Sequence, residues 1–75
     1  MKKDVRLRVL YVMELFVGQT DAENGVTMQE ILDFLAERDL TGERKSIYED
    51  IRALKEFGLD IQYSQSDKTY RLASR

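Results

Sequence analysis

The stretch "ERKSIYEDIRALKEFGL", residues 43–59, sets the interpretation of the whole sequence. Its apolar residues are spaced by four and then three positions, at Ile47, Ile51 and Leu54. This spacing places the three side chains on one face of a helix, where they form a buried stripe. Gly58 stands where a residue in the left-handed conformation ends such a helix. The stretch therefore predicts a helix over about residues 43–57.

After Gly58 the apolar period changes from helical to two, which is typical of β-strands. Apolar and polar residues alternate on both sides of the polar tip "SQSDK". We therefore predict a two-stranded hairpin over residues 59–73, with a loop of four or five residues, one face on the core and one in water. Because an isolated hairpin is not stable in water, it must pack on the helices.

Two further helices are predicted ahead of residue 43. The segment "DVRLRVLYVMELFV", residues 4–17, repeats apolar residues at helical spacing over most of its circumference. Its main stripe is Val5, Val9, Val12 and Phe16, broadened by Leu10, Met13 and Val17.

The segment "VTMQEI" carries a helix-start signature. Thr27 can cap the amide three residues on, and Glu30 can reach back to the cap. A second helix is expected from Met28 to about Arg38, with Ile31, Leu32 and Leu35 turned inward. Val26 is positioned to add a single bridging residue to the sheet.

The order helix, helix, helix, hairpin predicts an α+β fold, the winged helix-turn-helix, with the hairpin as its wing. The chain has 75 residues, no proline and no internal repeat, so we expect one domain over residues 1–75.

Composition argues against catalysis. The chain has neither His nor Cys, which removes imidazole bases, thiolate nucleophiles and the commonest zinc ligands. No paired-carboxylate pocket or glycine-rich phosphate loop can be identified, so we expect no enzyme, no metal and no cofactor.

The longest nearly apolar run, residues 9–17, contains Glu14 and is about half the length of a membrane span. The absence of Cys fits a cytoplasmic location.

Charge is unevenly distributed along the chain. The formal net charge is -2 and the pI is about 5.1, which counts mildly against nucleic-acid binding. The acids are concentrated between Asp21 and Asp39, whereas the two ends are neutral to basic. The first residues include Lys2, Lys3, Arg6 and Arg8, which could contact phosphates or simply form a solvated helix start.

The predicted third helix carries a basic and aromatic flank beside its apolar stripe, formed by Arg44, Tyr48, Arg52 and Lys55. A DNA-reading helix needs base-contacting residues in its first turns and cations beside them, and Arg44, Lys45 and Ser46 occupy the first turn. The acids Glu49 and Glu56 border the flank, and a solvated surface helix accounts for this helix alone equally well.

The hairpin favours the DNA-binding interpretation. Lys68 at its tip and Arg71 on the outward face of its second strand are expected beside the third helix, where a wing follows the phosphate backbone.

The sequence "ERKSIYEDIRALKEFGLDI" is similar to the recognition-helix signature of DeoR-like bacterial transcriptional regulators that join an N-terminal winged helix to a ligand-sensing WYL domain. The helix start "VTMQEI" and the closing "YRLASR" also resemble that family, so the resemblance covers nearly the whole chain. The chain departs from the family where many relatives carry a basic residue in place of Glu49 and Ser or Thr in place of Glu43.

The resemblance implies sequence-specific binding to double-stranded DNA by the N-terminal module of a longer regulator, acting as a homodimer. The implied DNA-binding residues are Thr27, Arg44, Lys45, Ser46, Tyr48, Arg52 and Lys68, and the wing argument adds Arg71. The alternative is a winged helix that binds another protein through its third helix or its acidic second helix and does not bind DNA.

Overall fold

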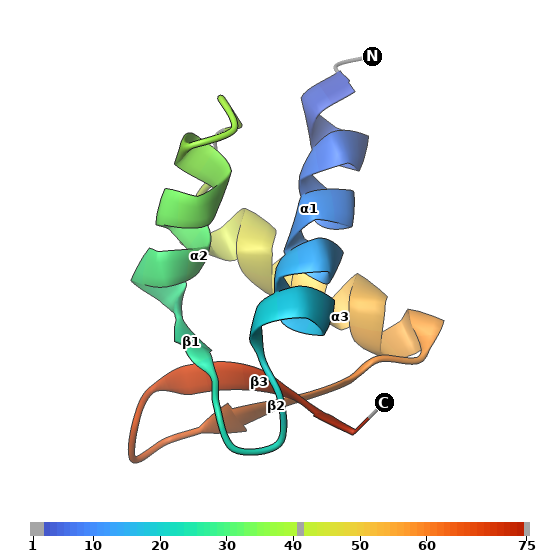
Figure 1. Cartoon of the computed structure of the whole chain (residues 1–75). Helices are drawn as coiled ribbons and strands as arrows, with labels where there is room; N and C mark the ends of the chain where they lie inside the picture. The colour runs from blue at the N-terminus through green and yellow to red at the C-terminus, as the bar shows by residue number, and fades with distance from the viewer. Residues whose placement is uncertain (1–2, 41, 75) are drawn as a thin grey trace.

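Three helices stand on one side of a small antiparallel sheet in the computed structural model, which describes residues 3–40 and 42–74 (Figure 1). The fold class is therefore α+β, as the sequence predicts. The elements follow in the order α1 (Lys3–Gln19), β1 (Val26–Thr27), α2 (Met28–Ala36), α3 (Arg44–Phe57), β2 (Asp60–Ser64) and β3 (Thr69–Ser74).

The sheet has three strands in the order β1-β3-β2, where the sequence predicted a hairpin of two. The hairpin of β2 and β3 is present, with Ile61 opposite Leu72 and Tyr63 opposite Tyr70. The added strand β1 pairs Val26 with Tyr70 and Thr27 with Thr69. The sequence predicted one bridging residue here, Val26, whereas the structure has two.

Gly25 allows this extra strand to reach the sheet. A Cβ built on Gly25 would lie 2.7 Å from the backbone oxygen of Tyr70, closer than such atoms can approach. Only glycine lets the two backbones come this near without a shift.

The predicted capping box at the start of α2 is confirmed. The Glu30 amide donates to Thr27 Oγ1 at 3.1 Å, and the Thr27 amide donates to Glu30 Oε1 at 2.8 Å. The helix ends at Ala36, slightly before the expected Arg38, because residues 37–39 form a turn that closes with the Leu40 amide donating to the Leu35 carbonyl.

The helix α3 matches its prediction closely. It begins at Arg44, and its cap residue Glu43 makes no side-chain cap bond, which leaves the first turn less well satisfied. It ends at Phe57, and Gly58 follows with a φ of 128°. The Gly58 and Leu59 amides both donate to the Leu54 carbonyl, at 3.1 and 3.0 Å, and close the helix end.

Gly58→Ala is expected to lower the free energy of unfolding by about 1 kcal/mol or somewhat more, because L-residues with a side chain rarely adopt this positive φ. The surrounding space is open, so the cost is one of backbone conformation and not of collision. Urea denaturation followed by circular dichroism measures the change. Gly18→Ala, in a helical position with equally open space, should be neutral or stabilising.

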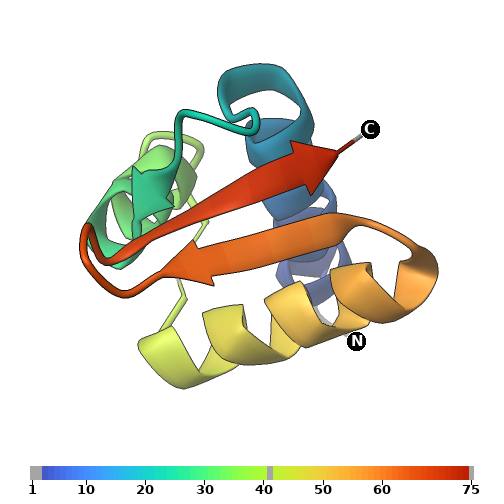
Figure 2. The same cartoon turned by 90° about the horizontal axis from the view of Figure 1, so that it is seen from below.

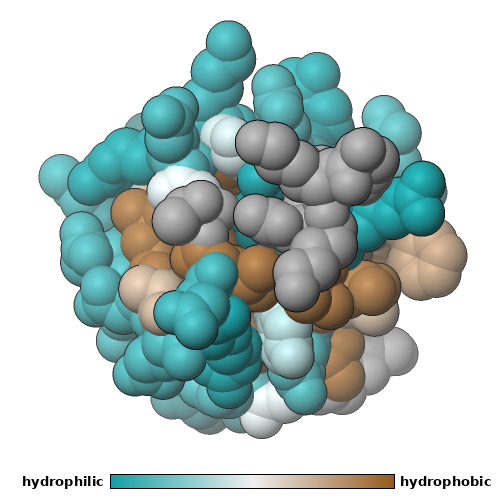
Figure 3. Space-filling model, turned by 90° about the horizontal axis from the view of Figure 1, so that it is seen from above, coloured by the Kyte–Doolittle hydropathy of each residue, from teal (hydrophilic) through white to brown (hydrophobic). Residues whose placement is uncertain are grey.

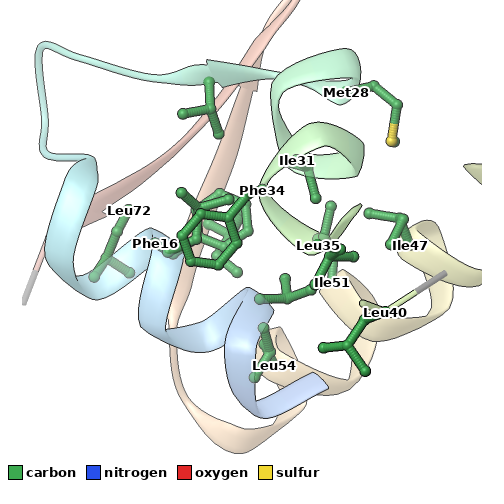
Figure 4. Close-up of a cluster of buried hydrophobic side chains, with 14 residues drawn as sticks. Phe16, Met28, Ile31, Phe34, Leu35, Leu40, Ile47, Ile51, Leu54 and Leu72 are labelled. Carbon is green, nitrogen blue, oxygen red and sulfur yellow. The ribbon is translucent and has the colours of Figure 1, made fainter. Parts of the chain in front are cut away.

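The core lies between the helices and the sheet (Figure 4). The predicted stripe of α3 is confirmed, since Ile47, Ile51 and Leu54 are all buried. So are Val12 and Phe16 of α1 and Ile31 and Leu35 of α2, whereas Leu32 is only half-buried. The complete cluster of buried apolar residues is Val12, Leu15, Phe16, Val26, Met28, Ile31, Phe34, Leu35, Leu40, Ile47, Ile51, Leu54, Ile61 and Leu72.

The prediction that Leu10 and Val17 broaden the buried stripe of α1 is wrong. Leu10 is 55% exposed and Val17 is 44% exposed, so these residues face away from the core. Leu15, outside the predicted stripe, is buried in their place at 2% exposure. The side chain of Val5 lies outside the part of the chain whose side chains are described.

Two polar contacts fix α1 to the rest of the fold. Arg8 forms a two-pronged ion pair with Asp50 of α3, with Nε to Oδ2 at 2.6 Å and Nη2 to Oδ1 at 2.9 Å. The buried Thr20 hydroxyl donates to the Phe16 carbonyl at 2.7 Å and accepts from the Leu72 amide at 2.9 Å.

Within the described residues, none of the helices has the length and apolar character required to span a bilayer.

Candidate nucleic-acid interface

Three chain segments meet at one end of the sheet. The view from below shows the hairpin turn, the start of α2 and the start of α3 at the same end, with α3 running alongside β2 (Figure 2). Between them lies a hollow of about 500 Å³. Of the eight predicted DNA-binding residues, Thr27, Arg44, Tyr48 and Lys68 line this hollow. We call it the junction hollow.

The cations of the junction hollow come from two different elements. Arg44 opens α3, and Lys68 closes the hairpin turn in a left-handed conformation, with a φ of 58°. The turn is held by the Lys68 amide, which donates to the Ser64 carbonyl at 2.7 Å. Asp67 is the acidic residue in the lining, so the two cations outnumber it. An anionic group could therefore be held between α3 and the turn.

Thr27 has a positioning role in the structure. Its hydroxyl accepts from the Glu30 amide, and its own amide donates to the Glu30 carboxylate. The amide is therefore occupied by the capping box, whereas the hydroxyl keeps its O–H as a donor. The next amides of the first turn, of Met28 and Gln29, point out of the helix as they do at any helix start, and both residues line the junction hollow. Thr27 therefore orients these amides.

Three tyrosines form the wall of the junction hollow. The rings of Tyr63 and Tyr70 lie 4.7 Å apart between centroids, on paired positions of β2 and β3. Burial, with the neighbouring Tyr48 hydroxyl as the second cause, raises the pKa of Tyr70 to about 12. The phenol is protonated at neutral pH, as that of an unperturbed tyrosine also is, and its hydroxyl can donate a hydrogen bond. The sequence predicted Tyr63 and Tyr70 only as strand residues. It gave no sign of their place in the site, because they reach it through the pairing of β2 with β3.

A second hollow of about 400 Å³ continues along α3 and shares Tyr48 with the junction hollow. It is lined by Arg52 and Lys55 from successive turns and also by Ile51 and the acidic Glu56. Arg52 is exposed, as a base-contacting or phosphate-contacting residue must be. The predicted basic and aromatic flank is thus one continuous surface from Arg44 to Lys55.

Lys45 and Ser46 lie outside both hollows. Lys45 is exposed on the first turn of α3, and Ser46 is half-buried beside it. They remain on the exposed end of α3, next to the surface formed by the flank.

Arg71 was expected on the outward face of β3 and beside α3. It lies on the outward face but not beside α3. Tyr70 and Leu72 face the helices, so the alternation of β3 turns Arg71 to the opposite face of the sheet. There it lines a separate hollow of about 540 Å³ with the α1–β1 loop.

Hydrogen bonds from Gln62 and Ser74 lower the pKa of Asp60, and the charge of Arg71 acts in the same direction. Within the described residues, no hydrogen-bond partner is found for Arg71 Nε.

The basic N-terminus offers fewer free cations for a nucleic-acid interface than its sequence suggests. The guanidinium of Arg8 is already paired, and its hydrogen bond to Asp50 raises the pKa of Arg8 above the ordinary value. The negative charge of Glu49 adds to this shift, so this acid acts on Arg8 as well as bordering the flank. Arg6 is exposed, whereas Lys2 and the side chain of Lys3 lie outside the described part of the chain.

Comparison of the chain with protein-family models, with curated proteins and with solved structures finds no match.

Proposed function

We propose that this chain is a winged helix-turn-helix domain that binds double-stranded DNA in a sequence-specific manner. In this proposal α3 enters the major groove, and the hairpin of β2 and β3 is the wing, extended by β1. The observation that carries the proposal is the junction hollow, where Arg44 of α3, Lys68 of the hairpin turn and the first amides of α2 meet. A phosphate backbone requires such donors from several elements around one helix.

The arrangement assigns different roles to the residues of the site. Arg52 and Lys45, exposed on α3, face the base edges or the flanking phosphates. Arg44, Lys68 and Tyr70 contact phosphates at the junction hollow, and Tyr48 supports this contact. Ser46, on the first turn of α3, contacts a neighbouring phosphate. We place Arg71 outside the DNA contact because it lies on the other face of the sheet.

The wider biological setting is also a proposal. The likeness of residues 43–61 to the DeoR-like, WYL-domain regulators supports a role as the N-terminal module of a cytoplasmic transcriptional regulator. Such a module would act as a homodimer on a two-fold symmetric operator.

The test is a selection from a library of duplexes with a randomised central segment, followed by titration of the enriched duplex at several salt concentrations. Arg52→Ala is expected to weaken binding by about 1–3 kcal/mol, which is about 5- to 150-fold, and to relax the preference at the base pair it contacts. Arg44→Ala should weaken binding to all sequences alike and make the salt dependence shallower.

The matched control is Arg38→Ala, which removes the same charge from the turn that follows α2, where the guanidinium stacks over Phe34 at 3.6 Å. Its DNA affinity should stay within about twofold of the parent chain, since it lies outside both hollows. The proposal fails if no sequence is enriched, or if all three substitutions change affinity equally.

A second candidate is a protein-binding winged helix, which the acidic surface of α2 favours. Glu30, Asp33 and Glu37 line a hollow of about 250 Å³ together with Phe34 and Arg38. The net charge of -2 is consistent with a basic partner at this surface. This function is supported if reversing the charges of Asp33 and Glu37 abolishes a pull-down while Arg52→Ala leaves it unchanged.

A further inference from the structure

The loop between α1 and β1 contains a chemically labile pair of residues. Asn24 is the single asparagine among the 75 residues, and Gly25 follows it. Asparagine is among the least heat-stable residues, because the amide nitrogen of the next residue can attack its side-chain carbonyl. Glycine in that next position hinders the attack least, since it has no side chain.

The α1–β1 loop is open to solvent. Asn24 is exposed, and so are the residues before it, Asp21, Ala22 and Glu23. The loop lies below the helices, at the sheet end of the molecule (Figure 1). The view from above shows the opposite end, where apolar side chains interrupt the hydrophilic surface (Figure 3). Contacts made by those apolar side chains leave the loop uncovered, so water and hydroxide reach Asn24.

The sheet requires glycine at position 25. A Cβ at Gly25 would lie 2.7 Å from the backbone oxygen of Tyr70 and 3.0 Å from both Cβ and Oγ1 of Thr69. The nearest of these atoms belongs to the backbone of β3, so it cannot move aside as the end of a flexible side chain could. The residue that makes Asn24 labile is therefore fixed by the packing of β1 against β3.

Asp21 holds Asn24 by both its backbone and its side chain. The Asp21 carboxylate accepts from the Asn24 amide at 2.9 Å and from Asn24 Nδ2 at 3.0 and 3.2 Å. The two residues also exchange backbone hydrogen bonds, at 3.0 and 3.3 Å. We call this set of contacts the Asp21 clasp. Bringing Asn24 Cγ against the Gly25 nitrogen changes torsion angles that these bonds fix, so the reaction proceeds from a locally opened loop.

We propose that Asn24 is a site of spontaneous deamidation and that the Asp21 clasp sets its rate. In the opened loop the Gly25 nitrogen loses its proton to hydroxide and bonds to Asn24 Cγ, and Nδ2 leaves as ammonia. Water then opens the cyclic imide. Cleavage between Cγ and the nitrogen gives aspartate, and cleavage between the main-chain carbonyl carbon and the nitrogen gives isoaspartate. The reaction consumes only water and does not depend on DNA binding.

Both products disturb the start of β1. Aspartate places a carboxylate where Nδ2 now donates to Asp21, so two acids meet at hydrogen-bond distance. Isoaspartate lengthens the backbone by one carbon immediately before Gly25, where β1 is already in close contact with β3. β1 ends at Thr27, the cap of α2, so either product weakens the pairing of β1 and the support of that cap.

The rate of the reaction is measured by mass spectrometry of the tryptic peptide that contains Asn24, after incubation of the chain at mildly alkaline pH. The parent chain should react about tenfold more slowly in native buffer than in urea, because the clasp must open first. This comparison uses the parent chain alone, so it does not depend on the folding of any variant. The proposal is overturned if the two rates are equal, or if Asn24 stays unmodified in urea.

Asp21→Ala separates the clasp from the rest of the fold. In native buffer it should react about tenfold faster than the parent chain, while circular dichroism shows that it stays folded. The matched control is Glu23→Ala, which removes an exposed carboxylate from the same loop without removing a bond to the Asn24 side chain. It should react at the parental rate, and all three chains should react alike in urea. Equal native rates for Asp21→Ala and Glu23→Ala contradict the proposal.

Asn24→Asp reproduces one product and tests its effect on the fold. It should raise the equilibrium constant of unfolding about 3- to 10-fold at neutral pH, because a donor to Asp21 is replaced by a like charge. In the Asp21→Ala background the same change should have almost no effect. Urea denaturation followed by circular dichroism measures both. An equal loss in the two backgrounds shows that the clasp is not what the product disrupts.

Discussion

Asp50→Ala is expected to lower the free energy of unfolding by about 3 kcal/mol, because it leaves the Arg8 guanidinium without its counterion in a poorly solvated place. The Arg8 side chain is only 12% exposed and that of Asp50 only 9%. A 75-residue domain has a total stability of about 4–11 kcal/mol, so this one change removes a large share of it. Urea denaturation followed by circular dichroism measures the loss.

A double-mutant cycle separates the ion pair from the packing of its side chains. Arg8→Met combined with Asp50→Ala should recover part of the loss, because no buried charge is then left unpaired. Asp67→Ala, at an exposed position of the hairpin turn, provides the baseline for removing a carboxylate. If Asp50→Ala is no more destabilising than Asp67→Ala, the ion pair contributes little to the stability of the fold.

Phe16→Ala should be at least as costly, at about 3–5 kcal/mol, and is expected to leave the chain largely unfolded at 37 °C. Phe16 has an exposure of 0% and lies in the core cluster with Phe34 and Leu72 (Figure 4). Truncation removes the ring and opens a cavity among side chains from helix and strand. Thermal unfolding in the presence and absence of moderate urea concentrations measures the effect.

Two companion variants give this experiment its contrast. Phe16→Leu preserves most of the apolar volume and should cost less than about 1.5 kcal/mol. Leu10→Ala removes a similar apolar group from the exposed side of α1, at 55% exposure, and should change stability by less than about 0.5 kcal/mol at low protein concentration. Equal losses from Phe16→Ala and Leu10→Ala would show that the core assignment of α1 is wrong.

The elements that the sequence predicted well are those whose signals are local. The stripe of Ile47, Ile51 and Leu54 lies within three helical turns, and the capping box joins Thr27 to a residue only three positions away. Such signals depend on the helical repeat and on first-turn geometry, so a reader of sequence alone can find them. The flank from Arg44 to Lys55 was found for the same reason.

The misassigned residues of α1 show where periodicity fails. When a helix is apolar around most of its circumference, several faces satisfy the same spacing, and only packing selects one. The structure selects Val12, Leu15 and Phe16 and exposes Leu10 and Val17. Hydrophobicity therefore identified the helix correctly, but it could not show which side lies against the core.

The contacts that sequence reasoning missed join residues far apart in the chain. Arg8 and Asp50 are separated by 42 positions, and each taken alone resembles an ordinary surface charge. The outward direction of Arg71 was predicted correctly, but its expected position beside α3 was wrong, because the outward face of the sheet lies next to the α1–β1 loop and α3 covers the other face. Tyr63 and Tyr70 reach the junction hollow through strand pairing.

The position of β3 has a consequence for how the chain folds during synthesis. β3 is the last strand along the chain, yet it lies in the middle of the sheet, between β1 and β2. Until it leaves the ribosome, β1 and β2 have no strand to pair with, and the Thr20 hydroxyl has no Leu72 amide to accept from. The sheet can therefore form, and cover the core side of the helices, only after β3 has been synthesised.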